Sequence, residues 1–278
     1  MLDKIIVDNI IQNALKEDMP LGDITTDNLI DENSKSKAKL IAKEAGILAG
    51  IEVAERVFRI LDPQVYFKAN FKDGESLKKG DIIAEIEGNT RALLKGERTA
   101  LNILQRMSAI ATKTNEYCQK VKDLPVKIVD TRKTTPGLRY LEKYAVRAGG
   151  GTNHRYCLSD GVLIKDNHIQ AAGGIKKAVE LARKSIPHTI KIEVETETLE
   201  QVAEALEAGA DIIMLDNMSY DMMKEAVKLI NKRAVVEASG NVSLETIYDI
   251  ACTGVDIISV GKLTHTVAAL DISMKFID

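Results

Sequence analysis

The sequence predicts an α/β protein in which a small α+β domain precedes a larger domain built on a parallel sheet. After Pro125, short apolar runs alternate with helical segments, which is typical of strands buried on both faces of a parallel sheet. Before Pro125, apolar residues alternate over 38–49, and Asp73-Gly74-Glu75 marks a turn between further short strands. These two patterns divide the chain.

The first part contains three predicted helices. Apolar residues recur at helical spacing over 2–16, 51–61 and 90–120, whereas 18–27 reads as a polar loop. Runs at 65–68 and 81–86 complete a sheet with 38–49. The first hundred residues thus predict one small α+β domain.

The second part predicts six strands with helices between them. Strands are expected at 126–130, 162–164, 189–195, 211–216, 234–238 and 256–260, and helices at 175–184, 199–208, 221–232 and 243–252. Six strands are too few for a closed eight-stranded barrel, and the absence of Gly-rich dinucleotide fingerprints argues against a Rossmann fold. A helix after Gly261 and a strand over 272–277 are expected to return to the first domain.

Composition excludes several classes of protein. The 278 residues are 45% hydrophobic and 28% charged, with a formal net charge of -3, which argues against a nucleic-acid binder. No apolar run is long enough to cross a bilayer, and no signal peptide opens the chain. Cys118, Cys157 and Cys252 fit neither a disulfide framework nor a zinc site, so we expect a cytoplasmic protein with no membrane partner.

The stretch 130–169 concentrates cationic residues around the glycines 149–151. Paired Arg and Lys next to a loop without side chains suit a polyanion with several carboxylate or phosphate groups. A solvated charged surface is the alternative. We favour the anion site because the cations alternate with apolar strand residues instead of occupying one face of a helix.

Polar residues or glycines follow each predicted strand of the second part. They are Arg132-Lys133, Lys165, Glu195, Asp216, Ser239-Gly240 and Gly261. In α/β barrels the active site lies at the carboxyl ends of the strands, and phosphate often binds after the last two. One polar strand end is explained equally well as a helix N-cap, for example at Asp216 or Ser243, but six together indicate a site.

Residue types divide this expected site into three parts. Ser239, Gly240, Gly261 and His265 form the expected phosphate cradle, although His265 is nearly as well explained as a surface histidine. Glu195 and Asp216 suit ribose hydroxyls or a Mg²⁺ ion held with substrate phosphates. The cations that remain for a carboxylate-bearing substrate are Arg132, His154, Arg155 and Lys165.

Several separated motifs resemble the quinolinate phosphoribosyltransferase family. They are GDITT, GERTALNILQRMSAIAT, DTRKTTPGLR, KYAVRAGGGTNHR, LIKDNH, IEVET, MLDNM, EASGN and SVGKLTH, in the family's order. The resemblance implies an open-faced α+β sandwich over 1–110, joined by 266–278, and an incomplete, seven-stranded α/β barrel over 111–265. The missing strand is expected near 152–155.

The resemblance also implies a reaction: phosphoribosyl transfer from 5-phosphoribosyl 1-diphosphate to quinolinate with decarboxylation, giving nicotinate mononucleotide for NAD biosynthesis. Lys133, Lys165, Glu195 and Asp216 would be catalytic, with Mg²⁺ and no organic cofactor. Arg98 would reach the active site of the partner chain in a homodimer that assembles further in some cases. On its own, the polar stripe that Arg98 leads reads as a solvated helix face.

Two other functions stay open from the residues alone. Lys165 at a strand end is a candidate for a Schiff-base lyase or aldolase. The same scaffold also suits a non-catalytic anion-binding protein, as in relatives associated with molybdenum transport, although the intact set of cations argues against a degenerate site.

Overall fold

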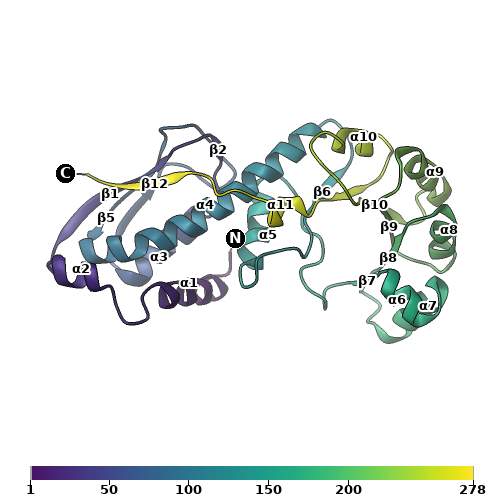
Figure 1. Ribbon diagram of the computed structural model, residues 1–278, viewed down its shortest axis with the longest axis horizontal. Coiled ribbons are helices and arrows are strands. Elements are labelled where there is room, and N and C mark those ends of the chain that lie inside the picture. The colour runs from purple at the N-terminus through teal and green to yellow at the C-terminus, as the bar shows by residue number, and fades with distance from the viewer. Residues whose placement is uncertain (1, 278) are drawn as a thin grey trace. The chain divides into compact units, whose positions relative to one another are not determined.

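The computed structural model describes residues 2–277, and the chain in it forms two compact units (Figure 1). Unit 1 consists of the chain up to Asn115, of Thr134–Gly150 and of the chain from Leu263 onwards. Unit 2 consists of Glu116–Lys133 and Gly151–Lys262. Thr134–Gly150 lies within the range 111–265 expected for the barrel and packs with unit 1.

Unit 1 is built on an antiparallel sheet in the order β12-β1-β5-β3. Its strands are β1 (Lys35–Ala42), β3 (Tyr66–Ala69), β5 (Ile82–Asn89) and β12 (Ile272–Ile277), while β2 (Gly46–Ile47) and β4 (Ser76–Leu77) pair separately. Along β1 the buried residues alternate at Ala38, Leu40 and Ala42, so one face of the sheet meets the core. The pairing of β12 with β1 confirms that the end of the sequence returns to the first domain.

Five helices belong wholly or largely to unit 1. They are α1 (Lys4–Asp18), α2 (Ile24–Leu29), α3 (Ile51–Leu61), α4 (Thr90–Lys120) and α5 (Arg139–Ala148). The expected helices 51–61 and 90–120 are confirmed to the residue. α3 buries Val53, Ala54, Val57 and Phe58, which lie at helical spacing, so its apolar face forms part of the core.

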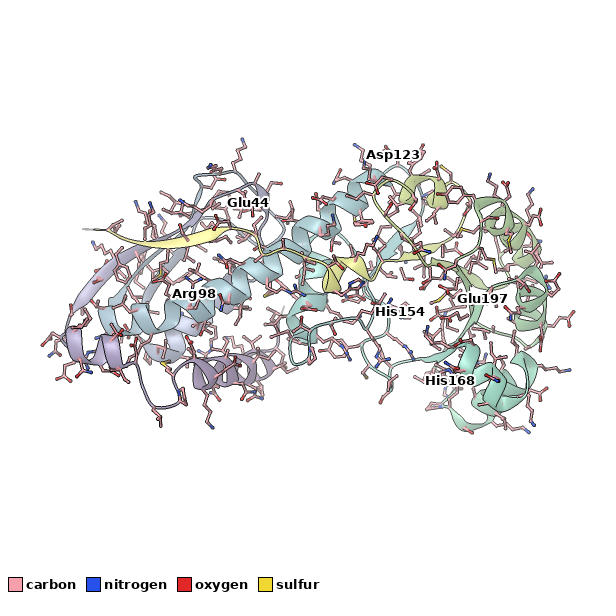
Figure 2. The ribbon with its side chains drawn as sticks, viewed as in Figure 1. Glu44, Arg98, Asp123, His154, His168 and Glu197 are labelled. Atoms are coloured by element: carbon pink, nitrogen blue, oxygen red, sulfur yellow. The ribbon has the colours of Figure 1, made fainter. Side chains whose placement is uncertain are left out.

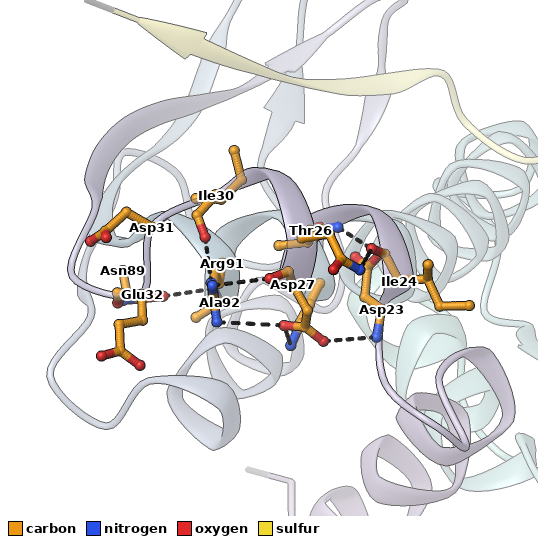
Figure 3. A network of polar contacts seen from close by, with 12 residues as sticks. Asp23, Ile24, Thr26, Asp27, Ile30, Asp31, Glu32, Asn89, Arg91 and Ala92 are labelled. Atoms are coloured by element: carbon orange, nitrogen blue, oxygen red, sulfur yellow. Dashed lines mark hydrogen bonds and ion pairs between the residues drawn. The ribbon is translucent and has the colours of Figure 1, made fainter.

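The expected polar loop over 18–27 is wrong in its second half, because α2 begins at Ile24. The Asp23 carboxylate caps this helix by accepting from the Thr26 N–H at 3.0 Å. Lys95 Nζ donates to Asp27 Oδ1 at 2.6 Å, and Arg91 Nε donates to the Ile30 carbonyl at 2.8 Å (Figure 3). Side chains of α4 therefore hold both ends of α2, a long-range contact that local sequence does not reveal.

Unit 2 is built on a parallel sheet in the order β6-β11-β10-β9-β8-β7. The strands are β6 (Lys127–Val129), β7 (Val162–Ile164), β8 (Ile192–Thr196), β9 (Ile212–Asp216), β10 (Val235–Ser239) and β11 (Ile257–Ser259). All six expected strands are confirmed. A seventh position is marked by one isolated parallel bridge between Val129 and Thr152, so the expected strand near 152–155 is reduced to a single paired residue.

Helices follow the strands of unit 2 in sequence. They are α6 (Asp166–Ala172), α7 (Ile175–Ser185), α8 (Leu199–Glu207), α9 (Tyr220–Ile230) and α10 (Ile247–Ala251), whereas the short α11 (Lys262–His265) begins at the last residue of unit 2 and continues in unit 1. Figure 1 shows α8 and α9 along the outer side of β8 and β9. The result is an incomplete α/β barrel whose strands all run in one direction, so their carboxyl ends share one edge.

The cations of the stretch 130–169 do not all alternate along strands, contrary to our expectation. Arg139, Lys143 and Arg147 lie four residues apart on α5, so they share one face of a helix and do not alternate along a strand. Lys143 is nevertheless buried on that face. The remaining cations of the stretch lie in unit 2.

Candidate active site

The polar residues that follow the strands of unit 2 gather at one edge of its sheet. Ser239 is paired with Asp216 across β10 and β9, and Glu195 is paired with Met214 across β8 and β9. Ile164 is paired with Val194, which places Lys165 level with Glu195. The carboxyl ends of β7, β8, β9 and β10 therefore present the expected site residues side by side.

The other half of the edge is formed by β11 and β6. Val129 is paired with Ser259, and the Val260 N–H donates to the Val129 carbonyl at 2.9 Å. Gly261 thus lies beside the start of the segment that carries Arg132 and Lys133. The structure brings these residues to the same edge as Ser239.

Lys165 and Glu195 form an ion pair between Nζ and Oε2. The Lys165 side chain is 46% exposed and that of Glu195 is 12% exposed, so the amine lies at the surface of the site and the carboxylate below it. The Lys165 N–H is directed at Nδ1 of His168, which lies in the first turn of α6 (Figure 2). His168 therefore fixes the main chain of Lys165.

The main chain after Ser239 packs closely against the main chain after Asp216. Gly240 has φ +90, and a Cβ there would lie 2.2 Å from Oδ1 of Asn217. Asn217 and Asn241 also have positive φ, at 53 and 50, and the Asn241 Nδ2 donates to Asn217 Oδ1 at 3.0 Å. Successive residues in this conformation can turn their N–H groups toward one concavity, which suits an anion.

His154 lies below this edge, inside unit 2. Its Nε2 is 3.1 Å from Oε2 of Glu193 and 3.4 Å from Oε2 of Glu237, both of which are buried. Burial alone would lower the pKa of His154, but the hydrogen bonds to Glu193 and Glu237 raise it to about 10. Sequence reasoning named His154 and missed both carboxylates.

The position of the protons follows from a further contact. The pKa of Glu193 is also raised, first by burial and then by the charge of Glu237, so the three groups share one more proton at neutral pH than they would hold in water. The Arg155 N–H is directed at His154 Nδ1 at 2.7 Å, and a second proton on Nδ1 would oppose it. We therefore place the ring proton on Nε2 and the shared proton on the carboxyl side.

The segment that carries His154 and Arg155 is held from both ends. Asp130, fully buried after β6, accepts from the His154 N–H at 2.9 Å and from Asn153 Nδ2 at 2.7 Å. Arg155 Nη1 donates to the Gly161 carbonyl at 2.8 Å. Burial and the charge of Arg132 lower the pKa of Arg155, while Glu193 raises it, so the two guanidinium groups are near each other.

Two expected site residues belong to unit 1. Arg98 lies on α4 with an exposed side chain, and among residues 2–277 no hydrogen bond or ion pair holds its guanidinium (Figure 2). His265 ends α11, is exposed, and has Nδ1 2.6 Å from Oγ1 of Thr266. Their roles stay predictions.

A large cavity of unit 2 lies elsewhere. It has a volume of about 1050 Å³ and is lined by residues at the amino ends of the strands, including Lys127, Lys191 and Asp211. Barrel chemistry is found at the opposite, carboxyl ends, so the cavity is not part of the site. Within 2–277, no helix has the length and apolar character needed to span a bilayer.

Comparison with known proteins identifies the family. Residues 23–108 match the N-terminal domain of quinolinate phosphoribosyl transferase, and residues 110–275 match its C-terminal domain. A probable nicotinate-nucleotide pyrophosphorylase (carboxylating) of Bacillus subtilis is 49% identical, over 95% of this chain and 91% of that protein. A corresponding protein of Synechocystis is 47% identical, over 98% and 93%.

Solved structures agree. The crystal structure of NadC from Streptococcus pyogenes is 46% identical and superposes with a TM-score of 0.96, covering 100% of this chain and 99% of that one. The nicotinate-nucleotide pyrophosphorylase of Francisella tularensis is 40% identical with a TM-score of 0.95, covering 100% and 98%. The motifs, the two domains and the arrangement of strands thus converge, and the chain belongs to the quinolinate phosphoribosyltransferase family.

Proposed function

We propose that this chain transfers the phosphoribosyl group of 5-phosphoribosyl 1-diphosphate to quinolinate, giving nicotinate mononucleotide, pyrophosphate and CO₂ as a step of NAD biosynthesis. The observation that carries the proposal is the shared edge of unit 2, where Lys165, Glu195, Asp216 and Ser239 lie at the carboxyl ends of four adjacent strands. Cations that suit a dicarboxylate and carboxylates that suit a sugar thus lie at one edge, in a chain of this family.

The reaction needs a nucleophile that the substrate itself supplies. The pyridine nitrogen of quinolinate forms a bond to C1 of the ribose while the bond from C1 to the pyrophosphate oxygen breaks. The bond from ring C2 to its carboxylate then breaks, CO₂ leaves, and C2 takes a proton from water. Because positive charge develops at C1, the protein's contribution is mainly positioning and electrostatic stabilisation.

Quinolinate is proposed to bind at the cationic side of the edge. Arg132, His154, Arg155 and Lys165 form this quinolinate pocket, and Lys133 neutralises the anions that bind or leave beside it. In the structure the Lys165 amine is paired with Glu195. Binding of quinolinate would give the amine a carboxylate partner and release Glu195 for a ribose hydroxyl.

The phosphate and metal are proposed to bind at the opposite side. Gly240 permits close approach of the main chain to a phosphate, together with Ser239, Gly261 and His265. Glu195 and Asp216 lie on adjacent strands, and such a pair fits Mg²⁺, which favours one or two carboxylates plus substrate phosphates. When bound there, Mg²⁺ would supply positive charge to stabilise the departing pyrophosphate.

The direct test is incubation of the protein with quinolinate, 5-phosphoribosyl 1-diphosphate and Mg²⁺, with detection of nicotinate mononucleotide and of CO₂ from the 2-carboxylate. Omission of each component in turn is the control. No product from folded protein would refute the proposal. Borohydride trapping of a carbonyl substrate on Lys165 would instead support a lyase.

We further propose a homodimer, which assembles further in some cases, in which Arg98 completes the partner's site. Arg98 is exposed on α4, and four apolar side chains are exposed on α1, on α2 or between these two helices: Ile5 at 74%, Leu21 at 97%, Ile24 at 81% and Leu29 at 75%. The network around Asp27 holds α2 in place, so Ile24 and Leu29 are presented on an ordered element (Figure 3). Large exposed apolar residues of this kind suit a protein interface.

A hybrid dimer tests the shared site. Arg98→Ala and Lys133→Ala are each expected to be nearly inactive, whereas in a hybrid one site carries both lesions and the other carries neither. With random pairing half the dimers are hybrids, so activity should return to about a quarter of wild type under two-fold symmetry. No recovery in verified hybrids would show that Arg98 serves its own chain.

The cytoplasm is the proposed compartment. Cys118, Cys157 and Cys252 are all free thiols, which suits a reducing environment. Fractionation of cells with an antibody to the protein would test this, and recovery with an organelle or an exported fraction would contradict it.

A further inference from the structure

Two buried carboxylates lie beneath the proposed anion site. Glu193 precedes Glu195 by two residues on β8, and Glu237 precedes Ser239 by two on β10, so each points to the same face of the sheet as its site neighbour. Their residues are only 3% and 1% exposed. Negative charge in this place repels a dicarboxylate, so on charge alone both side chains weaken the binding of quinolinate.

Both carboxylates contact the imidazole of His154. Its Nε2 lies 3.1 Å from Glu193 and 3.4 Å from Glu237, although β8 and β10 are separated by β9 in the sheet. The imidazole is therefore held from two strands at once. A ring held in this way has one orientation, which a single hydrogen bond would not fix.

The fixed ring in turn holds Arg155. Its Nδ1 faces the Arg155 N–H at 2.7 Å, while the other end of this residue is anchored through Nη1 to the Gly161 carbonyl at 2.8 Å. Asp130 holds the preceding N–H, that of His154, at 2.9 Å. The place of the Arg155 guanidinium thus depends on the orientation of the imidazole.

A metal site is the competing explanation for the same three residues, because their ligand atoms lie within 4.8 Å of one another. A histidine that binds a metal through Nε2 normally carries its proton on Nδ1 and donates it to a second group. Here Nδ1 faces a donor, the Arg155 N–H, so it must offer a lone pair. The contact at Nδ1 therefore favours a proton on Nε2 and hydrogen bonds to the carboxylates.

We propose that Glu193 and Glu237 are positioning residues for quinolinate: they fix the imidazole of His154, which sets the place of Arg155 in the quinolinate pocket. The inference rests on the proposed function. In this proposal, His154 lies beneath the substrate and acts on quinolinate binding by holding Arg155.

The test compares the effects of Leu and Gln substitutions at the two carboxylates on the binding of two ligands. Glu193→Leu and Glu237→Leu remove the acceptors, Glu193→Gln and Glu237→Gln keep an acceptor oxygen without charge, and exposed Glu207→Gln is the matched control. Calorimetry gives the Kd of quinolinate and, separately, of 5-phosphoribosyl 1-diphosphate with Mg²⁺. We expect the Leu variants to raise the Kd of quinolinate about 10- to 100-fold, the range for a charged hydrogen bond, and the Gln variants to raise it less. The Kd of 5-phosphoribosyl 1-diphosphate should change by less than about twofold in every variant, because both carboxylates form hydrogen bonds to His154 and not to the phosphate cradle.

The sign of the effect separates positioning from charge. If the carboxylates acted only through their charge, their removal would tighten quinolinate binding. Tighter or unchanged binding, or equal weakening of both ligands, would overturn the proposal. Should the Leu variants fail to fold, the Gln variants decide the question on the same terms.

A second readout does not depend on affinity. Nitrogen-15 resonances of His154 in the wild-type protein should show a proton on Nε2 and a lone pair on Nδ1. A protonated Nδ1, or a bound metal found by elemental analysis, would overturn the proposal. Failure of the wild-type protein to bind quinolinate would instead refute the proposed function, which distinguishes the two.

Discussion

Removal of Arg106 from α4 is expected to destabilise unit 1 strongly. Its guanidinium donates to Glu142 Oε1 through Nε at 3.1 Å and Nη2 at 2.9 Å. The same group donates to the carbonyl of Thr264, to Thr135 Oγ1 at 3.3 Å and to the carbonyl of Val267 at 3.4 Å. One side chain thus joins α4 to α5 and to two further segments of unit 1.

The magnitude follows from the burial of Glu142, whose side chain is 1% exposed. In Arg106→Met the carboxylate loses its charged partner and keeps the Thr135 N–H at 3.1 Å. Breaking a buried ion pair from one side costs about 3 to 5 kcal/mol, which corresponds to a fall in Tm of about 6 to 20 °C for a unit of this size. In Arg106→Met with Glu142→Leu no charge is left buried, so the double variant should be more stable than Arg106→Met alone.

Urea unfolding of the wild type, both single variants and the double variant completes a double-mutant cycle. The expected coupling between Arg106 and Glu142 is at least about 2 kcal/mol. A cost below about 1 kcal/mol for Arg106→Met would refute the reasoning, as would a double variant whose cost equals the sum of the single costs.

Three further outcomes are expected. Nicotinate, which lacks the second carboxylate, should be a substrate with kcat/KM lower by roughly 10⁴ to 10⁵ than quinolinate, and comparable values would contradict the proposed quinolinate pocket. At Gly240, with φ +90, a Cβ would lie 2.2 Å from a side-chain oxygen, so Gly240→Ala should weaken the binding of 5-phosphoribosyl 1-diphosphate far more than the binding of quinolinate. Gly173 has a similar φ of +85 but lies in open space, so the control Gly173→Ala should strain the backbone without affecting the binding of either ligand. Because contacts with Glu193 and Glu237 raise the pKa of His154 to about 10, the proton that these three groups share contributes stability that is complete below about pH 6.5 and is lost as the pH rises toward 10. Urea titrations should show this decline in the wild type and not in the double variant Glu193→Gln with Glu237→Gln.

The strands and the polar residues after them were predictable because both depend on local sequence. A buried parallel strand is a short apolar run, and the residue after it, such as Lys165 or Asp216, must lie at the carboxyl edge. The structure places these residues together as that rule requires. Their assignment to individual ligands stays a prediction.

Glu193 and Glu237 were missed for a different reason. Each stands inside an apolar run, where a charged residue reads as an irregularity of the strand, and only the three-dimensional contact with His154 explains it. A signal was present: each carboxylate stands two residues before a predicted site residue, on the same face of its strand.

The helices α2 and α5 could not be predicted from the spacing of apolar residues in the sequence. α2 has six residues, too few for a periodic signal, and its ends are held by Arg91 and Lys95 from a distant part of the chain. α5 follows a loop rich in polar residues and carries its cations four apart, a pattern that we interpreted as alternation along strands. In both helices tertiary contacts outweigh local preference.

The pairing of β12 with β1 has a consequence for synthesis. Next to this pair the Asp271 N–H donates to Glu44 across 227 residues of sequence, and ribosomes add about 5 to 20 residues per second. The outer edge of β1 therefore waits for roughly 10 to 45 seconds after its own synthesis before its neighbour exists, whereas a hairpin closes in microseconds. During that interval the nascent chain presents an unpaired strand edge, which invites pairing with other chains. A protein released without β12 would keep this edge open permanently, and we expect such a product to depend on chaperones for its solubility.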